Sequence, residues 1–119
     1  MYREVVEMDF SRLFRDVQKR PDAYGLNGGY REFVAFLNGC NSATGGRLLG
    51  GFSAYLAERL GSGSNLYWAL LVAKMGVSPN EIRRVDDISG ESERQVVSRL
   101  FAELLEFLES RDSKDVVVN

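Results

Sequence analysis

The chain has 119 residues, of which 45% are hydrophobic, and a formal net charge of -2 from 15 basic and 17 acidic side chains. This length and apolar content suit one globular domain, and the lack of excess positive charge argues against a nucleic-acid-binding protein. There is no histidine and only one cysteine, Cys40, which excludes histidine-activated nucleophiles, a disulfide within the chain and most zinc sites.

The apolar spacing predicts a first amphipathic helix over residues 10–20. The residues that recur at the i, i+3, i+4, i+7 spacing of one helical face are Phe10, Leu13, Phe14 and Val17. Asp9 or Ser11 can cap its start, and Pro21 ends it. Residues 22–29 are rich in glycine and predict a turn.

A second helix is expected from Tyr30 to about Asn38, with Gly39 as its stop. Residues 41–46 predict a loop. A third helix follows over roughly residues 47–60, and its start is open. It can contain Gly50 and Gly51, at a cost of about 1 kcal/mol each, or it can begin only at Gly51.

The segment from Leu66 to Met75 is apolar almost all round, which predicts a helix surrounded by other elements, capped by Ser64 or Asn65. We expect it to be the central helix of the fold. A buried strand is the alternative for such a run, but few of its residues are β-branched.

Residues 78–81 predict a short helical turn, and residues 83–90 are charged and irregular. The last helix is expected from Glu91 or Ser92 to about Arg111. Its apolar stripe comprises Val97, Leu100, Phe101, Leu104, Leu105 and Leu108. We expect the glutamates of this helix to lie mostly on the solvent face: Glu93, Glu103, Glu106 and Glu109.

These elements predict an all-α, single-domain bundle of about five helices over residues 1–111, followed by a polar C-terminal tail over residues 112–119. The longest apolar run has eight residues, from 66 to 73, whereas a membrane span needs about 20. The first seven residues contain no apolar core of a signal peptide. We therefore expect a cytoplasmic protein that does not enter membranes.

Two segments resemble known ligand-binding patterns only loosely. The glycine-rich stretch over residues 45–51 leads into a helix, but a phosphate-binding loop needs a preceding strand and a Gly-Lys-Ser/Thr ending, which this stretch lacks. The glutamates at 103, 106 and 109 could hold two metal ions only with histidine ligands from other helices. We therefore expect no cofactor, no metal and no catalytic residues.

An acidic cluster comprises Asp86, Asp87, Glu91 and Glu93. Its spacing does not match a calcium-binding loop. A solvated loop is one interpretation, and a surface that binds a basic protein partner is the other. Tyr24 lies in the glycine-rich turn and is the aromatic residue expected to be exposed, whereas Trp68 is expected in the core and Cys40 as a small buried apolar residue.

Three stretches together carry a resemblance: RPDAY over residues 20–24, GFSAYLAER over 51–59 and SNLYWA over 64–69. With the apolar pattern of the final helix over residues 100–108, the chain resembles small uncharacterised bacterial proteins that look like immunity proteins of polymorphic toxin systems. That group often reads Arg-Pro-Gly-Met-Tyr where this chain has Asp22 and Ala23. The resemblance implies binding to a cognate toxin in the producing cell, and blocking it.

The sequence therefore predicts an immunity protein that neutralises a cognate bacterial toxin by direct binding and has no enzymatic activity. We expect the acidic cluster to be the binding surface, with Tyr24 as an aromatic anchor. The alternative is a helical adaptor or regulator that binds a protein partner other than a toxin. A carboxylate-dependent enzyme is a third, less favoured reading.

Overall fold

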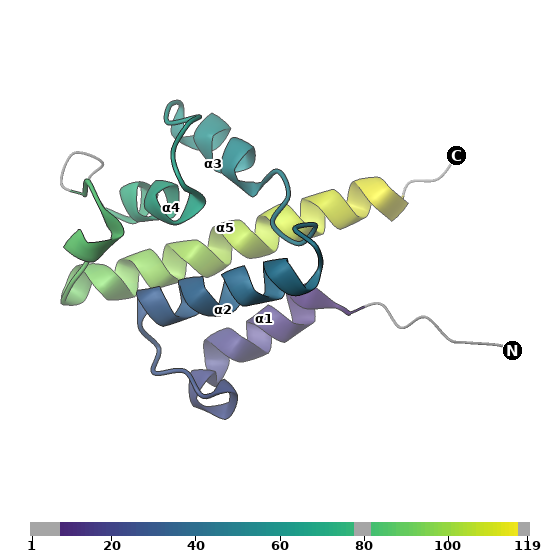
Figure 1. Cartoon of the computed structure of the whole chain (residues 1–119), viewed down its shortest axis with the longest axis horizontal. Helices are drawn as coiled ribbons and strands as arrows, with labels where there is room; N and C mark the ends of the chain where they lie inside the picture. Colours follow the sequence, from purple (N-terminus) through teal and green to yellow (C-terminus); the bar gives the residue numbers. More distant parts are fainter. Residues whose placement is uncertain (1–7, 78–81, 117–119) are drawn as a thin grey trace, which may run out of the picture.

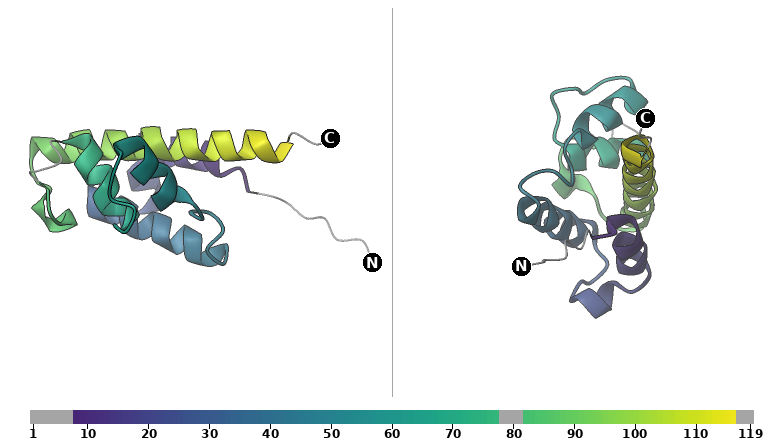
Figure 2. Two further views of the ribbon diagram at one scale, coloured as in Figure 1. Left: turned by 90° about the horizontal axis from the view of Figure 1, so that it is seen from above. Right: turned by 90° about the vertical axis from the view of Figure 1, so that its right-hand side faces the viewer.

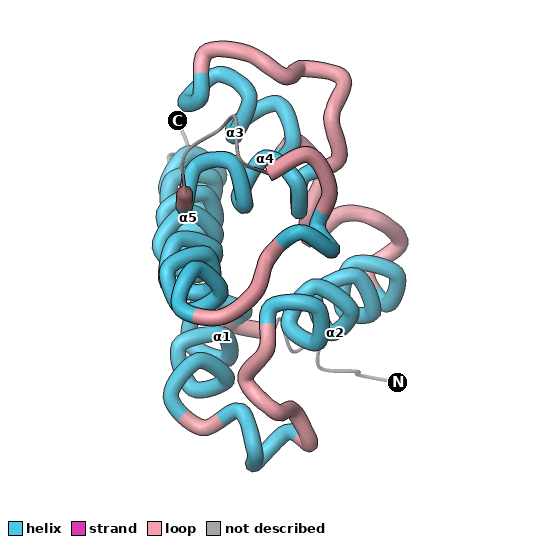
Figure 3. The backbone as a smooth tube through the Cα atoms, turned by 90° about the vertical axis from the view of Figure 1, so that its left-hand side faces the viewer, coloured by secondary structure: helices cyan, strands magenta, loops and turns pink. Residues whose placement is uncertain are grey.

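The computed structural model describes residues 8–77 and 82–116. The elements in chain order are α1 (Phe10–Lys19), the 3₁₀-helix η1 (Pro21–Tyr24), α2 (Tyr30–Ala43), α3 (Phe52–Leu60), α4 (Trp68–Gly76), the 3₁₀-helix η2 (Val85–Asp87) and α5 (Glu91–Val116) (Figure 1). No described residue lies in a strand (Figure 3). The prediction of an all-α bundle of about five helices is confirmed.

Helix α5 is the centre of the bundle. It has 26 residues and is about 39 Å long. It packs against all four of the other α-helices. Helices α1 and α2 lie on one side of it and α3 and α4 on the other, and its C-terminal end extends past them (Figures 1 and 2). The expectation that residues 66–75 form the central helix is therefore wrong. Helix α4 is apolar because it is packed between α3 and α5.

The start of α1 is confirmed, with Asp9 as its cap. The Asp9 carboxylate accepts a hydrogen bond of 3.1 Å from the backbone N–H of Arg12. The alternative cap, Ser11, lies inside the helix and is buried. Pro21 begins η1 directly after α1, and Gly25 ends η1 with a φ of 77°, so the predicted turn over residues 22–29 is partly helical.

Helix α2 runs past Gly39, so the predicted stop there is wrong. Gly39 is exposed within the helix, and a Cβ atom added to it meets no atom within 4 Å. The helix ends at Ala43, because Gly45 and Gly46 then adopt φ angles of 67° and 86°. The backbone N–H of Gly46 returns to the carbonyl of Asn41 at 2.8 Å.

Helix α3 begins at Phe52, which decides between the two starts that the sequence leaves open. Gly51 occupies the N-cap position with a φ of 87°, a left-handed conformation that glycine adopts without strain. Leu48 and Leu49 precede the helix and are nevertheless buried. The Asn41 side chain accepts a hydrogen bond of 2.9 Å from the Leu49 N–H, which ties this turn to α2.

Helix α4 starts at Trp68, later than predicted, and neither Ser64 nor Asn65 caps it. Tyr67 stands at the N-cap position without a side-chain capping bond. The preceding residues form a turn instead, in which Gly63 has a φ of 84° and its carbonyl accepts from the Leu66 N–H at 2.9 Å. The helical assignment of the segment is confirmed, and the strand alternative is wrong.

Helix α5 begins at Glu91, as expected, and continues beyond residue 111 to Val116. Residues 112–116, predicted to belong to a polar tail, therefore extend the helix. The predicted turn over residues 78–81 lies outside the described residues. None of the described helices combines the length and the apolar content needed to cross a membrane.

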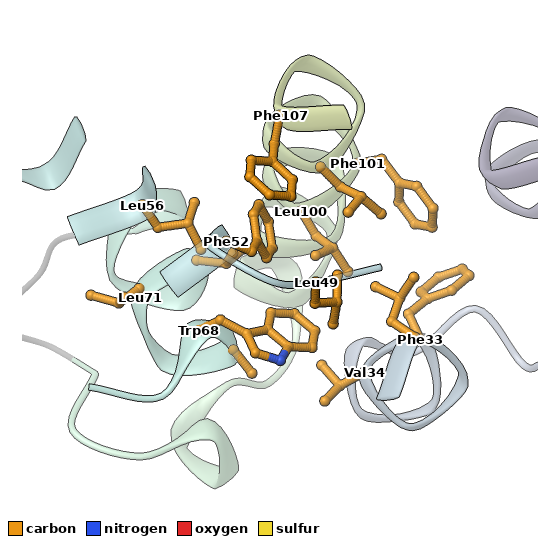
Figure 4. Close-up of a cluster of buried hydrophobic side chains, with 14 of the residues drawn as sticks. Phe33, Val34, Leu49, Phe52, Leu56, Trp68, Leu71, Leu100, Phe101 and Phe107 are labelled. Carbon is orange, nitrogen blue, oxygen red and sulfur yellow. The ribbon is translucent and has the colours of Figure 1, made fainter. Parts of the chain in front are cut away.

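The core is built around aromatic rings from α2, α3, α4 and α5 (Figure 4). The Phe52 ring centroid lies 5.0 Å from that of Phe107 and 5.7 Å from that of Trp68. Phe33 meets Phe101 edge to face at 4.9 Å. Each such buried side chain contributes about 1.5–3 kcal/mol relative to exposure, and the expected burial of Trp68 is confirmed.

Candidate functional site

The predicted acidic cluster gathers where α2, η2 and α5 begin. Asp87 Oδ2 accepts hydrogen bonds of 3.0 Å from the backbone N–H groups of both Arg83 and Arg84. These two bonds, that from Arg83 first, lower the pKa of the Asp87 carboxyl. Glu93 Oε2 accepts from the Tyr30 N–H at 2.8 Å. It therefore caps α2, whose N-cap residue Gly29 has no side chain to do so.

Asp86 and Glu91 are exposed, as Asp87 is, whereas Glu93 is half-buried. Asp86 forms an ion pair of 3.3 Å with Arg31, and Glu91 lies in the first turn of α5, where negative charge is favourable. Half of the predicted acidic surface is thus used to organise the chain itself.

Basic side chains share this end of the molecule. Exposed arginines flank the acidic residues: Arg31, Arg83, Arg84 and Arg94. A hollow between the start of α2 and the start of α5 is lined by Glu93 and Arg94 together. The surface is consequently of mixed charge, and its attraction for a basic partner is weaker than the sequence suggests.

Tyr24 is half-buried, so the expectation of an exposed ring is wrong. Its hydroxyl donates a hydrogen bond of 2.6 Å to Asp16 Oδ2, and its ring meets Phe36 edge to face at 6.1 Å. The hydrogen bond from Arg20, and then that from Tyr24, lower the pKa of Asp16 to about 2. Tyr24 thus holds η1 against α1 and α2.

Among the described residues, Tyr67 is the exposed aromatic side chain, with 49% of its surface accessible to solvent. Its hydroxyl accepts a hydrogen bond of 2.6 Å from the Asn38 amide. Asn38 also accepts from the Trp68 indole N–H at 3.3 Å. The sequence offered a signal for this exposure, because Tyr67 precedes the apolar helix and follows polar Ser64 and Asn65.

A polar cluster joins α3 to α5. Glu103 is only 3% exposed, and its two carboxylate oxygens lie 2.7 Å from Arg59 Nε and 2.9 Å from Arg99 Nε. Arg59 also reaches Glu106 at 3.2 Å, and Glu106 accepts from the Tyr55 hydroxyl at 2.9 Å. Burial, and then the bond to Glu106, raise the pKa of Tyr55 to about 12.

The burial of Glu103 contradicts its predicted place on the solvent face. The periodicity contained a signal for it, because Val96, Leu100, Glu103 and Phe107 recur at the spacing of one helical face. The predicted stripe omitted Val96 and Phe107, both of which are buried. With them included, Glu103 falls among core residues, and only a cationic partner makes that position tolerable.

The outer side of α3 bears a hollow of about 830 Å³, here called the α3 hollow. Its lining residues come from the turn before α3, from α3 and from the turn after it: Leu49, Gly51, Ser53, Ala54, Ala57, Glu58, Gly61, Ser62, Gly63 and Ser64. Small side chains dominate this lining, and Glu58 is the one charged residue among its described members. None of these residues was predicted from the sequence to bind a partner.

Another hollow, of about 530 Å³, lies along α1 and η1. It is lined by Arg12, Arg15, Lys19 and Arg20 together with Asp9 and Asp16. Arg15 is paired with Glu109 of α5 and Arg20 with Asp16. This surface is therefore also of mixed charge.

Metal binding and thiol chemistry find little support in the geometry. Within residues 8–77 and 82–112, no three His, Cys, Asp or Glu side chains form a group that could hold a metal ion. Cys40 is half-buried, and burial raises the pKa of its thiol, which disfavours the reactive thiolate.

Comparisons with protein-family models, with curated proteins and with solved structures find no match. The resemblance of residues 20–24, 51–59 and 64–69 to immunity proteins therefore stays a prediction.

Proposed function

We propose that the chain is an immunity protein that binds a cognate protein toxin and neutralises it. The observation that carries the proposal is the position of the segments that resemble immunity proteins. Residues 51–59 form α3 with its N-cap, and residues 64–69 lead into α4. Both contribute to the lining of the α3 hollow, the largest of the three hollows described above.

A rigid surface supports this role, because inhibition by binding is most effective when little entropy is lost on association. Helix α3 is fixed to α5 by the bonds of Arg59 to Glu103 and Glu106. In the turn before α3, the carbonyls of Arg47 and Leu48 accept hydrogen bonds of 3.0 and 2.8 Å from Arg111 of α5. The hollow is thus framed by anchored elements.

The acidic residues support the proposal less than expected from the sequence. Asp87 and Glu93 bind backbone N–H groups of this chain, whereas the exposed Asp86 and Glu91 accept no such backbone bond among the described residues. We propose the cytoplasm as the place of action, because the single Cys40 suits a reducing compartment.

A genetic experiment tests the proposal. The gene is deleted alone and together with each neighbouring gene in turn. We expect the single deletion to arrest growth and the loss of one neighbour, the toxin gene, to restore it. Growth of the single deletion under conditions in which every neighbour is expressed would falsify the immunity function, and a protein partner identified in such cells would favour the adaptor alternative.

A further inference from the structure

The α3 hollow has the volume and the apolar lining of a site that binds a side chain. Its volume of about 830 Å³ falls in the range of ligand pockets, roughly 300–1,000 Å³. Leu49, Ala54 and Ala57 give it apolar surface. Because the alanines are short, an alkyl chain a few carbons long can lie against this surface without displacing the side chains that form it.

Glu58 is the one charged residue of the lining, and its carboxylate has no partner among the described residues. Five other glutamates of the α-helices have partners within the chain, and each of their carboxylates contacts an N–H group, a hydroxyl or an arginine. They are Glu32, Glu93, Glu103, Glu106 and Glu109. Asp22 and Glu91 also lack such a partner, but each lies in the first turn of its helix, where negative charge is favourable.

Glu58 instead lies in the last turn of α3, where negative charge is unfavourable. The N–H groups of Gly61 and Ser62 both donate to the carbonyl of Ala57. Within the described chain, the carbonyls of residues 58–60 consequently accept no hydrogen bond. The Glu58 carboxylate lines the hollow, and the C-terminal end of α3 adjoins it, so this end of the hollow is negative.

Among the described residues, no lysine or arginine lines the hollow to compensate this charge. The neighbouring Arg59 is directed to Glu103 and Glu106 on α5. Ser62 and Ser64 add hydroxyl groups to the same end, and these can accept further hydrogen bonds from a cation. The local charge therefore favours a ligand that combines an apolar stem with a positively charged head.

From this arrangement we infer that the α3 hollow binds a lysine or arginine side chain of a partner protein. The stem lies on Leu49, Ala54 and Ala57, and the charged head binds Glu58 and the end of α3. The identification of the partner as the toxin rests on the proposed function, whereas the chemistry of the site does not.

The site itself is tested by NMR titration of the full chain at low ionic strength. The probe is N-acetyl-L-arginine N′-methylamide, and the uncharged probe is N-acetyl-L-norleucine N′-methylamide. We expect the arginine probe to shift amide signals of residues 49–64 and the norleucine probe to bind more weakly. Glu58→Gln should weaken arginine binding about two- to fivefold, the value of an exposed ion pair.

The matched control is Asp22→Asn, which removes an equally unpartnered carboxylate on η1, outside the hollow. It should leave the affinity unchanged. Ala54→Trp fills the hollow from an exposed position and should abolish the shifts while the thermal unfolding curve shows an intact fold. Equal affinity of Glu58→Gln and Asp22→Asn, or equal binding of both probes, would overturn the inference.

The growth assay described above tests whether the toxin supplies the lysine or arginine side chain that binds in the hollow. Glu58→Lys should lose protection against the toxin, and Asp22→Lys should keep it. If the wild-type chain protects and Glu58→Lys protects equally well, the toxin does not use this site, although the immunity function stands. If the wild-type chain does not protect, the immunity function fails, and the titration alone decides whether the hollow binds a cation.

Discussion

At the scale of single residues, the polar side chains of this protein divide into those that organise the chain and those left for a partner. Asp87 and Glu93 belong to the first group, since both bind backbone N–H groups. Glu58 belongs to the second. Sequence patterns identify acidic residues, but they do not show which carboxylates already have donors, because those donors come from segments far apart in the chain.

Glu103 provides the sharpest test of a buried charge in this fold. Glu103→Ala leaves Arg59 and Arg99 without the carboxylate between them, and we expect a loss of about 2–3 kcal/mol in the free energy of unfolding. The control is Glu109→Ala, which breaks the exposed pair with Arg15 and should cost less than about 1 kcal/mol. Urea unfolding curves of the two variants measure the difference, and similar losses would contradict the assigned role.

The Asp16 carboxyl makes the stability of the fold depend on pH in the acid range. Its pKa is lowered to about 2 from the ordinary 3.8 by the bonds from Arg20 and Tyr24. A depressed folded-state pKa contributes stability above the unfolded-state value, and this contribution is lost as the pH falls from about 4 through about 2. Asp16→Asn should therefore flatten the decline in melting temperature over this window, whereas the control Asp22→Asn should retain the wild-type decline.

At the scale of elements, the helices were predictable, but several of their boundaries were not. The apolar stripe that contains Phe10 and Phe14 predicted α1 correctly, because one face of this helix packs against the core. The end of α2 was placed wrongly at Gly39, since a glycine ends a helix only where the chain turns into the left-handed region. Gly45 and Gly46 do so, within the predicted loop over residues 41–46, whereas Gly39 lies inside the helix.

The two kinds of glycine should respond oppositely to alanine. Gly39→Ala adds a Cβ atom that meets nothing within 4 Å and should stabilise the protein by about 0.5–1 kcal/mol, because alanine favours helix. Gly51→Ala places a side chain at a φ of 87° and should destabilise it by about 1–2 kcal/mol. Thermal and urea unfolding measure both changes. A destabilising Gly39→Ala would indicate a contact at this exposed position.

The crossing of α4 and α5 depends on a third glycine. A Cβ atom at Gly76 would lie 3.0 Å from Val96 Cα, which is backbone and cannot move aside cheaply. Gly76→Ala should therefore destabilise the fold although alanine is the better helix former. The double variant Gly76→Ala/Val96→Ala should recover little of the loss, because the closest atom remains. Recovery to the level of Val96→Ala alone would show that the side chain is the obstacle.

At the scale of the whole molecule, each of the other α-helices packs against α5, and we therefore expect the bundle to unfold as one cooperative unit. Composition and periodicity predicted the fold class and the number of helices correctly. They did not predict which helix is central. Helix α5 is amphipathic, and the same apolar pattern occurs in helices that pack against a single neighbour at the surface. The α3 hollow was equally beyond prediction, since residues before and after α3 must fold together to form it.

Loss of packing in the middle of α5 should therefore weaken all helices together. Leu100 is fully buried, and Leu100→Ala should lower the free energy of unfolding by about 2–5 kcal/mol. Hydrogen exchange should accelerate by a similar factor for the slowest amides of α1, α2 and α4. Acceleration confined to α5 would show that the bundle opens in independent parts.

The hydrogen bonds of Asn38 provide this protein with an optical probe of its own surface. Trp68 is the single tryptophan of the chain, and the amide that binds its indole N–H also binds the hydroxyl of exposed Tyr67. A molecule that covers the Tyr67 ring or binds its hydroxyl changes the electric field at the Trp68 indole and the hydrogen bond that the indole N–H donates to Asn38. Intrinsic fluorescence of the unlabelled chain can therefore report when a partner arrives on the α2–α4 side, and how fast.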